Sequence, residues 1–391
     1  MNVNYGIDAK KLADYSFELG PIRPPSEAYS LLIRATRNCP WNRCQFCPVY
    51  KGQKFELRPT DDVVKDIESA KAIADEIKEL AWKMGLGDQI RNVAGTIYSS
   101  YQCNASVCNV ALWLWAGSTS AFLQDANTLI MRTPDLIRIV SSLKQNFPQL
   151  DRITSYTRSK TASKKSLEEL KELKDAGLSR LHIGMESGSD LVLSYVEKGV
   201  TAEEHIAGGK KVNEAGISLC EYVMPGLGGR KMSSEHVTGT ARVLNEINPD
   251  HIRLRTLHIR QDILLWSKVK AGDFEIQTED EVVKEIGKFI EKLEVTSELK
   301  SDHILNLLPE VEGKFPEAKS ACLATINRYL ALSDQEKINF RLGRRAGYYE
   351  RLEDLCDTHK YERVEEAIRR ITSEAPDGID QVILQLKSSF I

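Results

Sequence analysis

Three cysteines crowd into nine residues near the start of the chain, at Cys39, Cys44 and Cys47 in the segment RATRNCPWNRCQFCPVYKG. Their spacing is C-x4-C-x2-C, and they follow an apolar run over residues 30–36 that predicts a strand. Three thiolates on one loop can face one point. Four would close a zinc site or saturate a cubane cluster, whereas three leave one metal position open for a substrate or cofactor. The cysteines therefore predict chemistry rather than structure alone.

Other interpretations of these cysteines stay open at this point. The three thiols can be unremarkable, or they can bind a structural zinc whose fourth ligand is Cys103 or a histidine. Cys103 and Cys108 lie in an insertion between the first long helix and the second strand, and two ligands cannot complete an auxiliary cluster. We expect these two to be buried structural thiols.

Composition narrows the class of protein. The 391 residues carry a formal net charge of −3, which offers no wholesale attraction to phosphate backbones, so nucleic acid is not the expected partner. The longest apolar stretch, residues 110–116, is too short to cross a bilayer, and the first 17 residues lack the apolar core of a signal peptide. We expect a cytoplasmic protein without a membrane span. In that reducing compartment, eight cysteines do not indicate a disulfide framework.

Short apolar runs alternate with helical patterns along the next two hundred residues or so. Further strands are predicted over residues 121–125, 152–156, 180–185, 217–224 and 251–257. Helices are predicted over residues 60–85, 134–146, 166–176, 201–215 and 233–247. This alternation requires a parallel sheet with covering helices, in a doubly wound or partial-barrel arrangement, with chemistry gathered at the C-terminal ends of the strands.

The cysteine motif resembles the signature of the radical SAM superfamily, C-x3-C-x-aromatic-C, on the loop after the first strand. Phe46 stands at the aromatic position, and the first gap is one residue longer than usual. The block LHIGMESGSDLVLSYVEKGVTAEEHIAGGKKVNEAGI, residues 181–217, is similar to the branch with oxygen-independent coproporphyrinogen oxidase, the elongator-type acetyltransferase subunit and the methylthiotransferases. The resemblance covers roughly residues 29–262.

This resemblance implies an α/β fold, a partial (βα)6 TIM-like barrel with a helical C-terminal region. The predicted division is an N-terminal lead-in over residues 1–28, the barrel over 29–262 and the helical region over 263–391. The resemblance also implies that Cys39, Cys44 and Cys47 bind a [4Fe–4S] cluster. In the family, this cluster reductively cleaves S-adenosylmethionine, and the resulting 5'-deoxyadenosyl radical abstracts hydrogen from a substrate.

The family pattern also suggests cofactor-binding residues at the strand ends. It implies that Glu186 accepts hydrogen bonds from ribose hydroxyls and that Lys198 points toward the S-adenosylmethionine carboxylate. By the same resemblance, Gln124 and Asp125 lie near the amino group, although the usual G-G-E motif is absent. A capping carboxylate, an exposed lysine and an Asx-turn are the respective structural alternatives.

Two more strand ends offer polar groups. Arg158 follows the third strand and can meet an anionic or polar ligand, or can simply lie at the surface. Glu221 lies in the fifth strand, before a glycine-rich turn where backbone can approach the adenine closely. We include both among the predicted cofactor-binding residues.

The substrate is not readable from the sequence. The modest charge favours a small molecule, and an electron donor such as flavodoxin or ferredoxin is implied by the resemblance. Relatives that modify RNA keep an RNA substrate open. The alternative of a different class is an iron–sulfur or zinc-binding scaffold without turnover.

Overall fold

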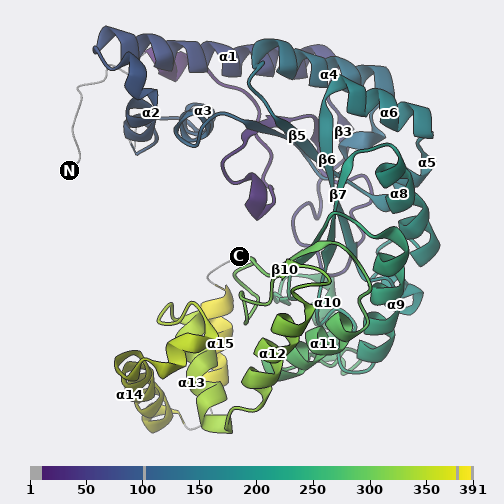
Figure 1. Ribbon diagram of the computed structural model, residues 1–391, viewed down its shortest axis with the longest axis vertical. Coiled ribbons are helices and arrows are strands. Elements are labelled where there is room, and N and C mark those ends of the chain that lie inside the picture. The colour runs from purple at the N-terminus through teal and green to yellow at the C-terminus, as the bar shows by residue number, and fades with distance from the viewer. Residues whose placement is uncertain (1–10, 100–102, 376–377, 389–391) are drawn as a thin grey trace. The chain divides into compact units, whose positions relative to one another are not determined.

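The computed structural model describes residues 11–99, 103–375 and 378–388 (Figure 1). The chain divides into two compact units. The first comprises residues 1–42, 49–183 and 211–219, and the second comprises residues 43–48, 184–210 and 220–391. The three-part division predicted from the sequence stays a prediction.

The first unit contains the start of a parallel sheet. Strands β1 (Leu31–Arg34), β4 (Ser120–Gln124) and β5 (Arg152–Thr157) pair in register, and β5 pairs with β6 (Leu178–Glu186). Helices α1 (Thr60–Lys83), α4 (Thr133–Asn146) and α6 (Leu167–Ala176) pack side by side (Figure 1). The other strands and α-helices described in this unit are β2 (Thr36–Arg37), β3 (Glu56–Leu57), α2 (Ile90–Tyr98), α3 (Ala105–Trp115) and α5 (Ser159–Lys164).

Local sequence explains why these elements begin and end where they do. Ser166 and Glu169 form a capping box at the start of α6, and Gly177 ends that helix with φ +119°. Ile33, Phe122 and Ile153 are buried along three neighbouring strands, because a parallel sheet is covered by helices.

The second unit continues the strand pattern and adds helices. Parallel strands β7 (Ser218–Val223), β8 (His251–Leu254) and β9 (Glu298–Lys300) pair in turn, and β10 (Gly313–Lys314) runs antiparallel to β9. The helices are α7 (Asp190–Tyr195), α9 (Ser233–Ile247), α10 (Leu264–Lys270), α11 (Glu279–Glu291), α12 (Lys319–Leu330), α13 (Asp334–Arg345), α14 (Thr358–Glu374) and α15 (Gly378–Ser388); α8 (Ala202–Glu214) has residues in both units. Helices α13, α14 and α15 pack on one another (Figure 1).

The sheet order is β1-β4-β5-β6-β7-β8-β9-β10, and over the described residues the sheet is open. The predicted α/β class with a partial barrel is confirmed. Two short strands, β9 and β10, were not expected in the region 263–391. At three and two residues, they are too short to show an alternating pattern. No helix in the described part of the chain is long and apolar enough to span a membrane.

The insertion after α1 corrects one expectation. Cys103 and Cys108, predicted to be buried structural thiols, instead form a disulfide, and both are half-buried. The reason is local. Asn104 caps α3 by accepting a hydrogen bond from the Val107 N–H at 2.9 Å, which brings the Cα atoms of the two cysteines to 5.9 Å.

Candidate functional site

The three clustered cysteines are half-buried. Cys39 belongs to the first unit, whereas Cys44 and Cys47 belong to the second. The Asn42 N–H donates to the Cys39 Sγ at 3.5 Å, and the Cys47 N–H donates to the Cys44 carbonyl at 3.3 Å. Over the described residues, no three His, Cys, Asp or Glu side chains are grouped closely enough to hold a metal ion. The fit to an iron–sulfur cluster therefore rests on the chemistry of the donor set, three cysteine side chains on one loop.

The second half of the cysteine loop, which comprises residues 38–50, is held tightly within the second unit. Phe46 lies in a buried apolar cluster against which Cys44 and Cys47 also pack; its other members are Val192, Val196, Met224, Leu227, Ile263, Leu265 and Phe274. The Gln45 N–H donates to the Val196 carbonyl at 2.9 Å, and the Gln45 carbonyl accepts from the Leu265 N–H at 3.0 Å. These contacts fix the turn between Cys44 and Cys47.

Glu186 and Lys198 lie beside this turn. Lys198 Nζ is 3.3 Å from Glu186 Oε1 and 5.5 Å from the centre of the Phe46 ring, a cation–π distance. Only 13% of the Glu186 side chain and 12% of the Lys198 side chain are exposed. Glu186 has φ +65°, a conformation that is uncommon for a non-glycine residue and recurs at functional sites.

A glycine makes room for the Glu186 carboxylate. A Cβ atom at Gly184 would lie 2.4 Å from Glu186 Oε1 and 3.3 Å from Lys198 Nζ. Since residues two apart in a strand share a face, only glycine leaves this carboxylate its present position. The G-x-E pattern at the end of β6 thus has a steric cause.

Glu221 completes the group in the second unit. Its side chain is fully buried in β7, and neither carboxylate oxygen has a hydrogen-bond partner among the described residues. Burial raises the pKa of Glu221 well above its usual value, the negative charge of Glu186 raises it further, and Lys198 opposes both. This raised pKa favours the neutral form of the carboxyl.

A buried polar chain that the sequence did not reveal supports the Glu186 turn. Ser187 Oγ lies 2.9 Å from His236 Nδ1, and His236 Nε2 lies 3.8 Å from Glu285 Oε1. Glu285 Oε1 also accepts from the Gly226 N–H at 2.7 Å. Burial lowers the pKa of His236, which keeps the ring neutral. The partners are about fifty residues apart in the chain, so no local pattern identifies them.

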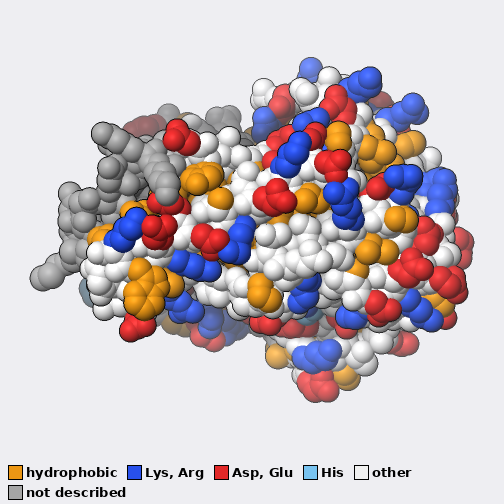
Figure 2. All heavy atoms as spheres, turned by 90° about the horizontal axis from the view of Figure 1, so that it is seen from above, with side chains coloured by type: hydrophobic (Ala, Val, Ile, Leu, Met, Phe, Trp, Pro, Cys, Tyr) orange, Lys and Arg blue, Asp and Glu red, His pale blue; other side chains and the backbone are white. Residues whose placement is uncertain are grey.

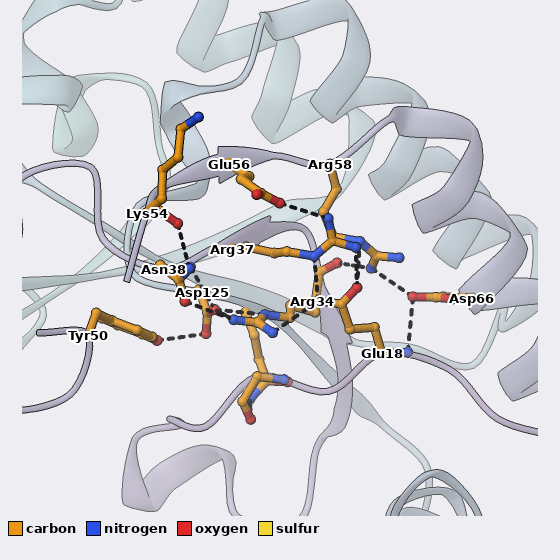
Figure 3. Close-up of polar contacts among 12 residues, drawn as sticks. Glu18, Arg34, Arg37, Asn38, Tyr50, Lys54, Glu56, Arg58, Asp66 and Asp125 are labelled. Atoms are coloured by element: carbon orange, nitrogen blue, oxygen red, sulfur yellow. Dashed lines mark hydrogen bonds and ion pairs between the residues drawn. The ribbon is translucent and has the colours of Figure 1, made fainter. Parts of the chain in front are cut away.

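Gln124 and Asp125, predicted near the amino group of S-adenosylmethionine, lie in the first unit among protein partners. The Gln124 side chain accepts from the Gly20 N–H at 2.9 Å and donates to the carbonyls of Gly20 at 3.0 Å and Ile22 at 2.8 Å. Asp125 contacts Arg34 and Tyr50 (Figure 3). Their predicted cofactor contacts stay predictions.

Arg158 lies over an aromatic ring of the cysteine loop. Its guanidinium carbon is 5.1 Å from the centre of the Trp41 ring, and its backbone N–H donates to Asn127 Oδ1 at 3.0 Å. Trp41 stands between Cys39 and Cys44 in the sequence. Arg158 is thus placed near the loop, while its cofactor contact stays a prediction.

The comparison with protein families gives the class. The model described as the radical SAM superfamily matches residues 33–238, more than half of the chain. The chain therefore belongs to the radical SAM superfamily, a class of enzymes whose cofactors are a [4Fe–4S] cluster and S-adenosylmethionine. The predicted superfamily is confirmed, and the finer branch stays a prediction. None of the curated proteins matches the chain.

Several solved structures are similar to the chain at low sequence identity. Coproporphyrinogen III oxidase (HemN) from Escherichia coli is 16% identical with a TM-score of 0.45, covering 67% of this chain and 51% of that one. Elp3 from Methanocaldococcus infernus is 15% identical with a TM-score of 0.39, covering 47% and 48%. TsrM from Kitasatospora setae is 15% identical with a TM-score of 0.42, covering 62% and 37%. The chain spans about half of these structures or less.

Proposed function

We propose that this chain cleaves S-adenosylmethionine reductively and abstracts hydrogen from a small-molecule substrate. Flavodoxin or ferredoxin would supply the electron, in an oxygen-poor cytoplasm. The observation that supports the proposal best is the Glu186–Lys198 pair, which lies against Phe46 of the cysteine motif. When bound, the reduced cluster and S-adenosylmethionine together supply methionine and a 5'-deoxyadenosyl radical.

Each residue of this group has a role in the proposal. Cys39, Cys44 and Cys47 would hold the cluster through their thiolates. Glu186 is positioned to accept hydrogen bonds from ribose hydroxyls, and Lys198 to meet a carboxylate. These two side chains are mostly buried, so water competes weakly for their hydrogen bonds.

Glu221 offers a different kind of contact toward the nucleoside. A neutral carboxyl carries one O–H donor and one free carbonyl oxygen, whereas an ionised one can only accept. Because both of its oxygens lack partners within the described residues, a ligand with complementary groups would remove the cost of burying them.

The substrate class rests on charge. On the face shown in Figure 2, Lys and Arg side chains alternate with Asp and Glu, and the whole chain has a net charge of −3. A mixed surface of this kind favours a small molecule over RNA, which usually binds a surplus of positive charge. RNA modification is the second candidate within the same chemistry.

The test is anaerobic reconstitution followed by counts of iron and sulfide and an assay of 5'-deoxyadenosine by mass spectrometry. We expect cleavage by the native chain and none by Cys39→Ala, Cys44→Ala or Cys47→Ala. Cys103→Ala and Cys108→Ala serve as matched controls and should retain cleavage. Zinc in place of iron, or a loaded cluster without cleavage, would favour the scaffold interpretation.

A further inference from the structure

A single buried carboxylate touches the cysteine loop close to both of its ends. Asp125 Oδ2 accepts from the Asn38 N–H at 3.2 Å, and Asn38 directly precedes Cys39. Asp125 Oδ1 accepts from the Tyr50 hydroxyl at 2.8 Å, and Tyr50 lies three residues after Cys47. The cysteine loop, residues 38–50, is thus tied near both ends to the residue that follows β4 (Figure 3).

The charge of Asp125 is balanced inside the protein. Its side chain is fully buried, and Arg34 of β1 donates to Oδ2 from Nε at 2.8 Å and from Nη2 at 2.7 Å. Burial raises the pKa of Asp125, while the hydrogen bond from Tyr50 and the charge of Arg34 lower it. The same guanidinium donates to Glu18 at 2.9 Å, so the ion pair continues into the N-terminal segment.

The N-terminal segment closes over this carboxylate. A Cβ at Gly20 would lie 2.4 Å from Asp125 Oδ1, so the backbone of residue 20 approaches as closely as a glycine allows. Both oxygens of Asp125 already accept from protein donors. Its contacts are those of a group that holds the chain in place.

We infer that Asp125 is a positioning residue for the cysteine loop. It fixes the position of Cys39 through Asn38, and it restricts the conformations of the other end of the loop through Tyr50. The inference rests on the proposed function only in that the loop holds a cluster. A loop fixed close to both ends loses less conformational entropy when its thiols converge, so cluster capture is favoured. The contact with the S-adenosylmethionine amino group predicted for Asp125 is not needed for this role.

The experiment uses Asp125→Asn and Tyr50→Phe, which alter the tethers with little change in shape. Asp66→Asn is the matched control, because Asp66 belongs to the same network but lies outside the loop. Its carboxylate accepts from Arg58 at 2.7 Å and from the Glu18 N–H at 3.3 Å, and neither of these partners belongs to the loop. The alkylation rate of Cys39 is followed by mass spectrometry in the cluster-free chain with its disulfide intact. Exposed Cys356 serves as the internal reference.

We expect Cys39 to react faster in both test variants, on the order of fivefold for each lost hydrogen bond, with Cys356 unchanged. Iron bound per chain after reconstitution should fall in both variants and stay at the native value in Asp66→Asn. Equal Cys39 rates in Tyr50→Phe, Asp66→Asn and the native chain would overturn the inference, and Tyr50→Phe keeps this test valid where Asp125→Asn fails to fold. A native chain that binds no iron would refute the proposed function alone, since the alkylation rates need no cluster.

Discussion

Asp125, which follows β4, and Glu221, which lies in β7, are both fully buried acids, yet their surroundings are opposite. In the first unit, Asp125 accepts from a guanidinium, a backbone N–H and a phenol. In the second unit, Glu221 has no hydrogen-bond partner within the described residues. A buried polar group without a partner lowers the stability of the folded chain. The satisfied Asp125 therefore suits holding a loop in place, whereas the unsatisfied Glu221 suits binding a ligand that supplies the missing partners.

The largest stability effect is expected at the ion pair beside Glu221. Lys198→Met leaves the Glu186 carboxylate mostly buried without its cation, which we expect to cost about 2–4 kcal/mol of unfolding free energy. Urea denaturation of the cluster-free chain measures this. Lys210→Met is the control, because Lys210 and Glu246 form an exposed pair at 3.1 Å, and its loss should cost at most about 0.5 kcal/mol. Equal losses of unfolding free energy in the two variants would mean that the buried pair contributes no more than the exposed one.

Glu221→Gln sharpens the comparison between the two buried acids, because we expect this substitution to stabilise the folded chain. The pKa of Glu221 lies above the ordinary value of 4.5, so above pH 4.5 the folded chain binds a proton that the unfolded chain releases. Stability therefore falls as pH rises from 4.5, by about 1.4 kcal/mol for each pH unit up to the folded pKa.

The glutamine variant cannot ionise and should lose that slope. We expect it to be more stable than the native chain at pH 7 and similar to it at pH 4, in urea titrations repeated across pH. A native chain with the same pH profile as the variant would mean that Glu221 is ionised in the folded state.

The smallest effect is expected at a carboxylate that is only partly buried and has hydrogen-bond donors. Glu169 accepts from Thr133 and from the Ser166 N–H in the capping box of α6, and these bonds lower its pKa to about 2. The contribution of the ionised Glu169 to the free energy of unfolding is present above pH 4.5 and is lost as the pH falls from there toward 2. Glu169→Gln should cost about 0.5–1 kcal/mol at pH 7, and this loss should shrink below pH 4 in thermal unfolding. A loss that stays constant down to pH 3 would contradict the assignment.

Much of the fold follows from local patterns in the sequence. All six predicted strands are present with their ends shifted by at most three residues, because each is an apolar run bounded by turn or capping residues. Helices α2 and α3, the disulfide and strands β9 and β10 were missed or predicted otherwise. The two strands are too short to show a pattern, and the disulfide depends on a distance between side chains that composition does not encode.

The candidate site divides in the same way. Glu186 and Lys198 were predicted from a motif, and the structure places them 3.3 Å apart. The chain from Ser187 through His236 to Glu285 and the tether from Asp125 to Tyr50 join residues 49 to 75 positions apart, so only the folded structure reveals them. Local patterns can identify ligand candidates, while the residues that hold them in place come from the topology.

The most direct test of the central contrast is S-adenosylmethionine binding by equilibrium dialysis to anaerobically reconstituted native chain, Glu186→Ala and Asp125→Asn, expressed per bound cluster. We predict that Glu186→Ala keeps its iron and loses affinity on the order of tenfold or more. Asp125→Asn should bind less iron, while each loaded chain binds S-adenosylmethionine as the native chain does. The reverse pattern, with iron lost in Glu186→Ala and affinity per cluster lost in Asp125→Asn, would contradict the account.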